Sequence, residues 1–307
     1  MSLTLFFIVE PPAYQYLACY LAASIRENLP DEVQLVGYCP AHRLAEVDPD
    51  AAETLRRMRC DLRTIQAEGR FAPDYPHGNK ILACLEPRET EYSGFMDSDV
   101  LMIRRNSIET LIKPNHVSAS AAASMHWAPQ SIWETIYDAF DMEIPTERIT
   151  LMRDKRKPVV PYYSSGFVVF PEGYRTTLGL SFPQIWMDTA QRIDAIDGLI
   201  RRRPYLDQMS LPLAIRRSGL AWNELPEEQH YILGGRLRGK PFPKTREIFT
   251  VHYRKWEVLK ENELAERGYK YLKRQVGARR VSNISGKPLP AGIAPNPNYS
   301  GNDHFQL

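Results

Sequence analysis

The sequence predicts an α/β fold with a mainly parallel central sheet flanked by helices. Two observations support this class. Short apolar runs rich in β-branched and aromatic residues alternate with helical patterns along the chain, which is typical of strands covered on both faces by helices. The composition, 43% hydrophobic and 25% charged over 307 residues, is that of a globular protein with a substantial core.

The first half of the chain carries the clearest alternation. Residues 3–9 form an apolar run closed by Pro11 and Pro12, which predicts a buried strand. From residue 13 to residue 28 apolar side chains recur at helical spacing, and Pro30 ends this helix. Further strands are expected over 33–38, 62–65, 92–96 and 116–123, and further helices over 51–59, 80–85 and 132–140.

The second half is less regular. A strongly apolar strand is expected over 165–170, helices over 182–196 and 207–217, a short strand over 249–252, and helical structure over 261–275. Residues 278–307 are rich in Gly, Pro, Asn and Ser and predict an irregular C-terminal tail. We therefore expect a single domain over residues 1–277, followed by that tail.

Charge and cysteine usage exclude several classes of protein. Lys and Arg total 39 against 37 for Asp and Glu, and this balance gives no reason to expect nucleic acid as a partner. The four cysteines lack C-x-x-C spacing, which favours reduced, buried thiols over a zinc site or disulfides. The run at 3–9 is too short for a signal peptide, and no transmembrane segment is found. We expect a cytoplasmic protein, with peripheral membrane contact left open.

The strongest local motif is Asp97-Ser98-Asp99, directly after the expected strand 92–96. Residues i and i+2 of an extended chain face the same side, so both carboxylates can hold one hard cation that binds diphosphate oxygens. Open α/β sheets place their ligands at the carboxyl ends of strands. The alternative is a surface turn. A second triplet, Asp48-Pro49-Asp50, follows no buried strand, and we interpret it as a solvated loop.

Several short motifs follow one another along the chain. They are Lys80-Ile81-Leu82, Asp97-Ser98-Asp99, the strand Ser164-Ser165-Gly166-Phe167-Val168-Val169-Phe170, Asp207-Gln208, Asn223-Glu224-Leu225-Pro226, and His252-Tyr253 with Lys255-Trp256. With the motifs in this order and spacing, the chain resembles the GT-A-fold glycosyltransferases, particularly the glycogenin and lipopolysaccharide-galactosyltransferase-like group. The motifs span most of the chain. Two positions depart from the family pattern: Ser164 stands where Asn is frequent, and no proline separates Lys255 from Trp256.

The resemblance implies a GT-A fold in which residues up to about 125 bind the nucleotide and residues 126–277 bind the sugar and the acceptor. It implies a hexosyltransferase that moves a sugar from a nucleotide-sugar donor, with a UDP-sugar favoured, to a carbohydrate or other hydroxyl acceptor, with retention of configuration. The implied cofactor is Mn²⁺ or Mg²⁺, held by Asp97, Asp99 and His252. A hydrogen-bonded, half-buried histidine is the alternative for His252.

The other implied site residues each have a structural alternative. Asp207 and Gln208 are the expected catalytic residues at the sugar or acceptor, although Asp207 would also suit a helix N-cap. Lys80 is expected at the ribose or a phosphate, with a helix-surface lysine as the alternative. Lys255, or its neighbour Arg254, would neutralise the leaving diphosphate, and the alternative is a solvated basic turn.

The donor contacts are completed by small and aromatic residues. Tyr14 is expected to stack on the nucleotide base, because Tyr16 fits the buried face of its helix. Ser98 and Ser165 are expected at the donor, and Gly166 would let a sugar approach the backbone or else mark a bulge. The basic run at 201–203 is expected to be a solvated face, with an anionic acceptor as the other interpretation.

Two further functions remain open from the sequence. A sugar nucleotidyltransferase would carry a glycine-rich basic loop after its first strand, where this chain has Glu10-Pro11-Pro12-Ala13. A non-catalytic protein that binds a nucleotide or a sugar on the same fold is the other, against which the two carboxylates and His252 argue.

Overall fold

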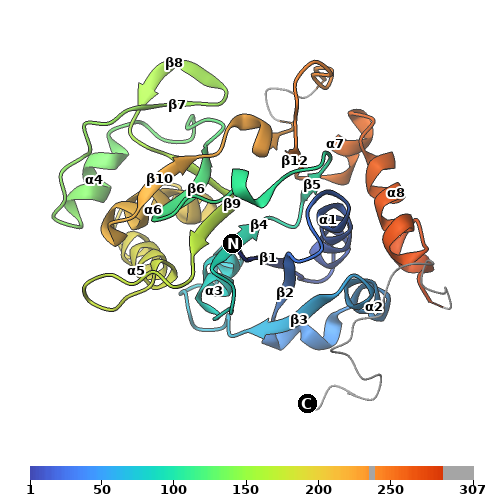
Figure 1. Cartoon of the computed structure of the whole chain (residues 1–307). Coiled ribbons are helices and arrows are strands. Elements are labelled where there is room, and N and C mark those ends of the chain that lie inside the picture. The colour runs from blue at the N-terminus through green and yellow to red at the C-terminus, as the bar shows by residue number, and fades with distance from the viewer. Residues whose placement is uncertain (235–238, 286–307) are drawn as a thin grey trace.

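A seven-stranded sheet runs through the centre of the computed structural model, which describes residues 1–234 and 239–285 (Figure 1). In spatial order its strands are β10 (Ala221–Glu224), β6 (His116–Ala121), β9 (Tyr163–Pro171), β4 (Tyr92–Met96), β1 (Leu3–Ile8), β2 (Gln34–Pro40) and β3 (Cys60–Ile65). Neighbouring strands are parallel except at β9, which runs antiparallel to both β4 and β6. The expected α/β class with a mainly parallel sheet is confirmed.

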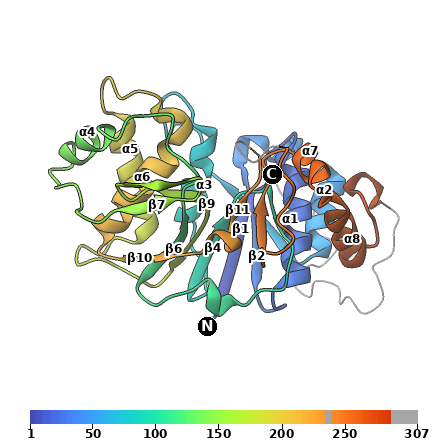
Figure 2. The same ribbon diagram turned by 90° about the horizontal axis from the view of Figure 1, so that it is seen from above.

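Helices cover both faces of this sheet (Figure 2). They are α1 (Tyr14–Asn28), α2 (Pro49–Arg57), α3 (Asn79–Leu85), α4 (Ile132–Asp138), α5 (Phe182–Asp194), α6 (Arg202–Ser218), α7 (Trp256–Glu261) and α8 (Ala265–Val276). Helices α1, α2, α7 and α8 contribute to one hydrophobic core, and α3, α4, α5 and α6 contribute to a second core on the opposite face.

The central strand β1 supplies both cores because successive side chains of a strand point to opposite faces. Phe6 packs with α3 and α5 residues in one core, whereas Leu5 and Phe7 belong to the other. Phe6 also makes edge-on ring contacts with Phe95 of β4 and Phe170 of β9. An apolar run without polar alternation is therefore what this doubly covered strand requires.

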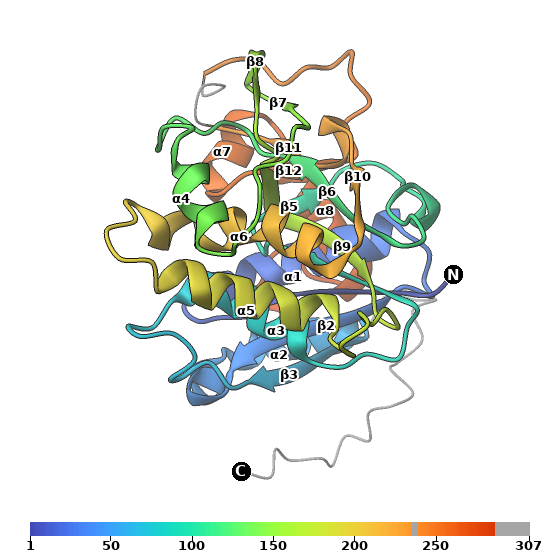
Figure 3. The same ribbon diagram turned by 90° about the vertical axis from the view of Figure 1, so that its left-hand side faces the viewer.

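Two smaller sheets complete the fold. Strands β11 (Tyr231–Ile232), β12 (Thr250–His252) and β5 (Val100–Met102) form a three-stranded sheet, in which β12 pairs antiparallel with β5. The β7 (Ile149–Leu151) and β8 (Asp154–Val159) hairpin projects at the top of Figure 3. The strands β5, β7, β8, β10 and β11 were not predicted from the sequence.

Several boundaries differ from the sequence-based expectation. Helix α6 begins at Arg202, so Asp207 lies inside the helix and the interpretation of Asp207 as an N-cap is wrong. Pro204 lies in the first turn of α6, where a missing backbone N–H is tolerated, so it does not interrupt the helix. The helical structure expected over 261–275 is found as α8, and the short helix α7 that precedes it was not expected.

The second acidic triplet is also different from the expected solvated loop. Asp48 is the N-cap of α2, and its carboxylate accepts a hydrogen bond from the backbone N–H of Asp50. Its other oxygen accepts from the Tyr16 hydroxyl at 2.5 Å. The sequence Asp48-Pro49-Asp50 therefore starts a helix, with proline at its first position.

The end of the described chain packs more closely than an irregular tail would. Ala278, Val281 and Ile284 are buried in the core shared with α2 and α8, while the expected tail residues 286–307 lie outside the described residues. All four cysteines are buried and free, as expected. None of the helices in the described part of the chain is both long and apolar enough to span a bilayer.

Candidate functional site

The site lies where the carboxyl ends of β1 and β4 meet the start of β9. Because β9 runs antiparallel to β4, its first residues come beside the residues that follow β4. The backbone N–H of Asp97 donates to the carbonyl of Gly166 at 2.9 Å. This edge is where open α/β sheets bind their ligands, and the antiparallel strand adds a third source of side chains to it.

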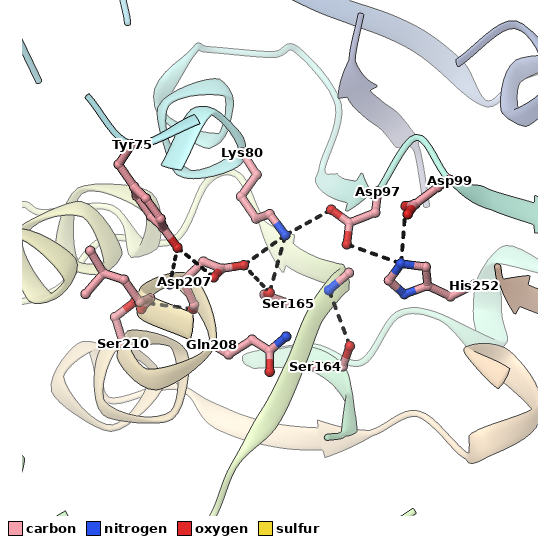
Figure 4. Close-up of polar contacts among 12 residues, drawn as sticks. Tyr75, Lys80, Asp97, Asp99, Ser164, Ser165, Asp207, Gln208, Ser210 and His252 are labelled. Carbon is pink, nitrogen blue, oxygen red and sulfur yellow. Dashed lines mark hydrogen bonds and ion pairs between the residues drawn. The ribbon is translucent and has the colours of Figure 1, made fainter. Parts of the chain in front are cut away.

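Asp97, Asp99 and His252 converge at this edge (Figure 4). His252 Nε2 lies 3.2 Å from Asp99 Oδ1 and 3.9 Å from Asp97 Oδ2. Potential ligand atoms of the three residues all lie within 4.8 Å of one another. The pairing of β12 with β5, in which His252 faces Val100, carries the imidazole to the acidic triplet from 153 residues later in the chain (252 minus 99).

Opposite charges stabilise one another in this cluster. Burial raises the pKa of Asp99, but the charge of His252 and the hydrogen bond between them lower it, and the result lies below the ordinary value. Burial lowers the pKa of His252, but Asp99 and then Asp97 raise it above its ordinary value. Asp99 is thus ionised at neutral pH, with an imidazole directly beside it.

His230 is a member of the site that sequence reasoning missed. Its Nε2 lies 3.3 Å from His252 Nδ1, and the ring is fully buried. Burial, then the positive charge of His252, lower the pKa of His230 far below its ordinary value, so this imidazole is neutral. A neutral His230 can accept the Nδ1–H of His252, which leaves His252 Nε2 facing the carboxylates. His230 follows a 3-10 helix and belongs to no motif that could have revealed it.

Lys80 forms the second half of the site. Its Nζ lies 2.9 Å from Asp97 Oδ1 and 2.9 Å from Asp207 Oδ2, so the alternative of a helix-surface lysine is wrong. Burial lowers the pKa of Lys80, but Asp207 and Asp97 raise it above its ordinary value. Asp207 also accepts hydrogen bonds from Ser165 Oγ at 2.5 Å and from the Tyr75 hydroxyl at 3.0 Å. Lys80 thereby joins α6 to the end of β4.

Gln208, the neighbour of Asp207, is half-buried and also held by aromatic residues. Its Oε1 accepts a hydrogen bond from the Tyr162 hydroxyl at 2.8 Å. Tyr162 in turn accepts one from the indole N–H of Trp127 at 3.2 Å. The motifs on which the resemblance rests contain neither Tyr162 nor Trp127.

The remaining expected donor contacts are distributed around this cluster. Tyr14, the first residue of α1, is 45% exposed. Partial burial, then the charges of Asp99 and Asp97, raise its pKa. The Ser98 hydroxyl donates to the carbonyl of Ile8 and so joins the triplet to the end of β1.

The basic residues expected at the diphosphate lie in the turn between β12 and α7. Lys255 is the exposed residue that precedes α7. Arg254 is also exposed, and its charge acts on both His252 and His230. In the basic run at 201–203, Arg202 and Arg203 form ion pairs with Asp194.

The absence of a side chain at Gly166 leaves space for Asp97 and His230. A Cβ at this position would lie 2.7 Å from Asp97 Oδ2 and 2.9 Å from His230 Nε2. Real Cβ contacts are longer than this, so a side chain here would displace the carboxylate, the imidazole or the strand. Position 166 therefore requires glycine because the side chains of Asp97 and His230 lie directly against its backbone.

Gly166→Ala is expected to weaken the binding of Mn²⁺, one of the cations that the resemblance implies, by about 10–100-fold, the range for disturbing a group that orients a metal ligand. Isothermal titration with Mn²⁺ measures the effect. Gly173→Ala is the matched control, because a Cβ at Gly173 meets nothing within 4 Å. Equal Mn²⁺ affinity in the two variants would show that the position of Asp97 is unimportant for the cation.

Comparisons with other proteins bear on the fold and the family. Residues 5–219 match the profile of a family described as a Rhodobacterales glycosyltransferase domain. No curated protein sequence matches this chain.

Similar solved structures cover most of this chain. Mouse xyloside xylosyltransferase 1, in its apo form, has a TM-score of 0.54 at 12% identity, with 82% of this chain and 97% of that chain covered. The galactosyltransferase LgtC, in complex with donor and acceptor sugar analogs, has a TM-score of 0.54 at 11% identity, with 93% and 97% covered. The bifunctional glycosyltransferase WbbM, in its apo form, has a TM-score of 0.50 at 14% identity, with 87% and 49% covered.

Proposed function

The chain belongs to the Rhodobacterales glycosyltransferase domain family and has the GT-A fold, and from this premise we propose that it transfers a sugar from a nucleoside-diphosphate sugar to a hydroxyl acceptor with the help of a divalent cation. The predicted resemblance to GT-A glycosyltransferases, including the lipopolysaccharide galactosyltransferase LgtC, is confirmed. The single observation that carries the cation-dependent mechanism is the convergence of Asp97, Asp99 and His252 on one point.

The donor set fits a divalent ion. Two carboxylates and one imidazole suit Mn²⁺ or Mg²⁺, and the nitrogen ligand favours Mn²⁺ of the two. His230 can accept a hydrogen bond from Nδ1 of His252, which would leave Nε2 of His252 directed at the carboxylates, as expected of a metal-binding histidine. When bound, the cation would offset the negative charge that grows on the departing diphosphate.

The protein's own residues would orient the reactants. Lys80 holds one oxygen of Asp97, so the other oxygen lies on the side of His252. The same lysine and Ser165 hold Asp207, and we infer that Asp207 and Gln208 contact the transferred sugar. Tyr14, an exposed aromatic residue at the start of α1, would lie against the nucleotide base, and Arg254 or Lys255 would meet the diphosphate.

We propose that the two halves of the chain bind different parts of the substrates. Residues up to about 125 supply the β1 and β4 ends and would bind the nucleotide, while residues 126–277 supply β9, α6 and β12 and would bind the sugar and the acceptor. The donor is proposed to be a UDP-sugar, the acceptor a carbohydrate or another hydroxyl compound, and the reaction to retain the anomeric configuration.

A donor-hydrolysis panel tests the proposal. Several nucleotide sugars are incubated with the protein, with Mn²⁺ or with EDTA, and released nucleoside diphosphate is measured. We expect release from one class of donor only, dependent on Mn²⁺, and faster with a suitable acceptor. Nucleotide binding without turnover of any donor would instead indicate a binding protein, and formation of a sugar nucleotide from a sugar phosphate and a nucleoside triphosphate would indicate a nucleotidyltransferase.

A further inference from the structure

The side-chain amide of Gln208 is held by a hydrogen-bonded chain that has only one favourable direction. We propose that Trp127 and Tyr162 fix this amide so that its NH₂ group, and not its oxygen, faces the bound donor sugar. The inference rests on the proposed function, because it concerns the sugar that Asp207 and Gln208 are proposed to contact.

Trp127 sets the direction of the hydrogen bonds that lead through Tyr162 to Gln208. An indole N–H can only donate, so the Tyr162 hydroxyl, 3.2 Å away, accepts from it. Tyr162 is fully buried, and its own hydrogen has Gln208 Oε1 as its acceptor at 2.8 Å. If the Gln208 amide were turned over, the hydroxyl would accept twice and its hydrogen would be buried without this acceptor, which is unfavourable.

Trp127 and Tyr162 are each fixed by further aromatic contacts. The Trp127 ring stacks on Tyr205, with centroids 4.4 Å apart and planes at 12°, and Tyr205 lies one turn before Gln208 on α6. Tyr162 also packs edge-on against the buried ring of Trp133, with centroids 5.8 Å apart. Because α4, α6 and the start of β9 all contribute, the orientation of the amide is part of the fold.

The amide therefore offers hydrogen atoms to the site. Figure 4 shows Gln208 beside Ser164 and Ser165, with its nitrogen turned toward Ser165 and its oxygen turned away. The oxygen already accepts from Tyr162, and among the residues that the structure describes the NH₂ group makes no hydrogen bond, so its two N–H groups are left for oxygen atoms of a ligand. This assigns Gln208 as a hydrogen-bond donor to a sugar hydroxyl, and Tyr162 and Trp127 as positioning residues that act through it.

The test compares binding of UDP with binding of the UDP-sugar that the wild type turns over, each in the presence of Mn²⁺, by isothermal titration. Tyr162→Phe is expected to weaken UDP-sugar binding about tenfold and to leave UDP binding unchanged, because Gln208 contacts only the sugar. Gln208→Glu is a second variant, since its carboxylate still accepts from Tyr162 but has no N–H to donate. We expect it to lose sugar affinity by at least as much.

Tyr163→Phe is the matched control. Tyr163 is the next residue, is equally buried, stacks on Trp222, and makes no hydrogen bond through its hydroxyl within residues 1–234 and 239–285. Loss of the Tyr163 hydroxyl should change neither the affinity for UDP nor the affinity for the UDP-sugar. Thermal unfolding of every variant verifies that the fold is retained.

A double-mutant cycle separates positioning from a general structural effect. In a Gln208→Ala background, Tyr162→Phe should cause no further loss of UDP-sugar affinity or of kcat/KM. Equal losses in both backgrounds, or a parallel fall in UDP affinity, would overturn the inference while leaving the proposed function intact. Failure of the wild type to bind UDP or any UDP-sugar would instead remove the UDP donor of the proposed function, and this inference with it.

Discussion

Asp99→Ala is expected to lower metal-dependent release of nucleotide by at least about 10²–10³-fold, the cost of removing a group that stabilises charge in a transition state. Asp99 is 8% exposed, and its carboxylate faces His252 at 3.2 Å. The loss would leave the proposed cation with one carboxylate and one imidazole. The measurements are the rate of nucleotide release at saturating donor and the affinity for Mn²⁺ by paramagnetic resonance.

The fold should survive this change, because the backbone carbonyl of Asp99 still accepts from the Tyr253 N–H at 3.0 Å. The other acidic triplet provides a matched control. Asp48→Asn removes a charge of the same kind but keeps a good N-cap for α2, so activity should be unchanged. Near-normal, Mn²⁺-dependent turnover by Asp99→Ala would rule out the proposed cation site.

Lys80→Met is expected to reduce the free energy of unfolding by about 3–5 kcal/mol, since it leaves the buried carboxylate of Asp207 and the half-buried carboxylate of Asp97 without their cation. Lys80 Nζ is 2.9 Å from an oxygen of Asp97 and 2.9 Å from an oxygen of Asp207, and Asp207 is 4% exposed. Donor turnover should also be lost, because Asp97 and Asp207 lose the group that fixes them. Denaturant unfolding followed by circular dichroism measures the stability.

The pH dependence of this loss distinguishes a charge effect from a packing effect. In the wild type, burial raises the pKa of Asp207, but Lys80 and the Ser165 hydrogen bond hold it below its ordinary value. That stabilisation is present above the unfolded pKa of about 3.9 and is lost as the pH falls through the folded pKa. In Lys80→Met, burial prevails and the folded pKa rises, so the variant regains stability on acidification.

The difference between wild type and Lys80→Met should therefore be largest near pH 7 and should shrink as the pH falls. The double variant Lys80→Met with Asp207→Asn removes the unpaired charge and should recover much of the lost stability at pH 7. A loss that is independent of pH, and that the second substitution does not reduce, would show that packing of the lysine stem, and not its charge, is responsible.

The sequence predicted those elements whose apolar pattern is local. β1, α1 and α5 have apolar or amphipathic runs bounded by proline or a capping residue, and these elements and β4 were found within a few residues of their expected limits. The acidic triplet and its position after a buried strand were also readable, because the strand and the carboxylates are adjacent in the chain.

The features that escaped prediction depend on distant partners. β10 has half-exposed or exposed residues and is a strand only because β6 pairs with it. His230 has a role only through β12, and the ion pairs of Lys80 arise from strand order, which no local pattern specifies. The capping function of Asp48 was readable in principle from the proline that follows it.

The antiparallel pairing of β12 with β5 limits how far this protein can be shortened. The region that matches the family profile stops at residue 219, and a version ending soon after Gln229 would still contain every strand of the central sheet. It would lack both imidazoles, and β5 would lose its neighbour along the whole of one edge. Fragments made for expression must therefore extend past His252. A protein cut at residue 219, where the family profile stops, would keep Asp97 and Asp99 but lose the imidazole that faces them.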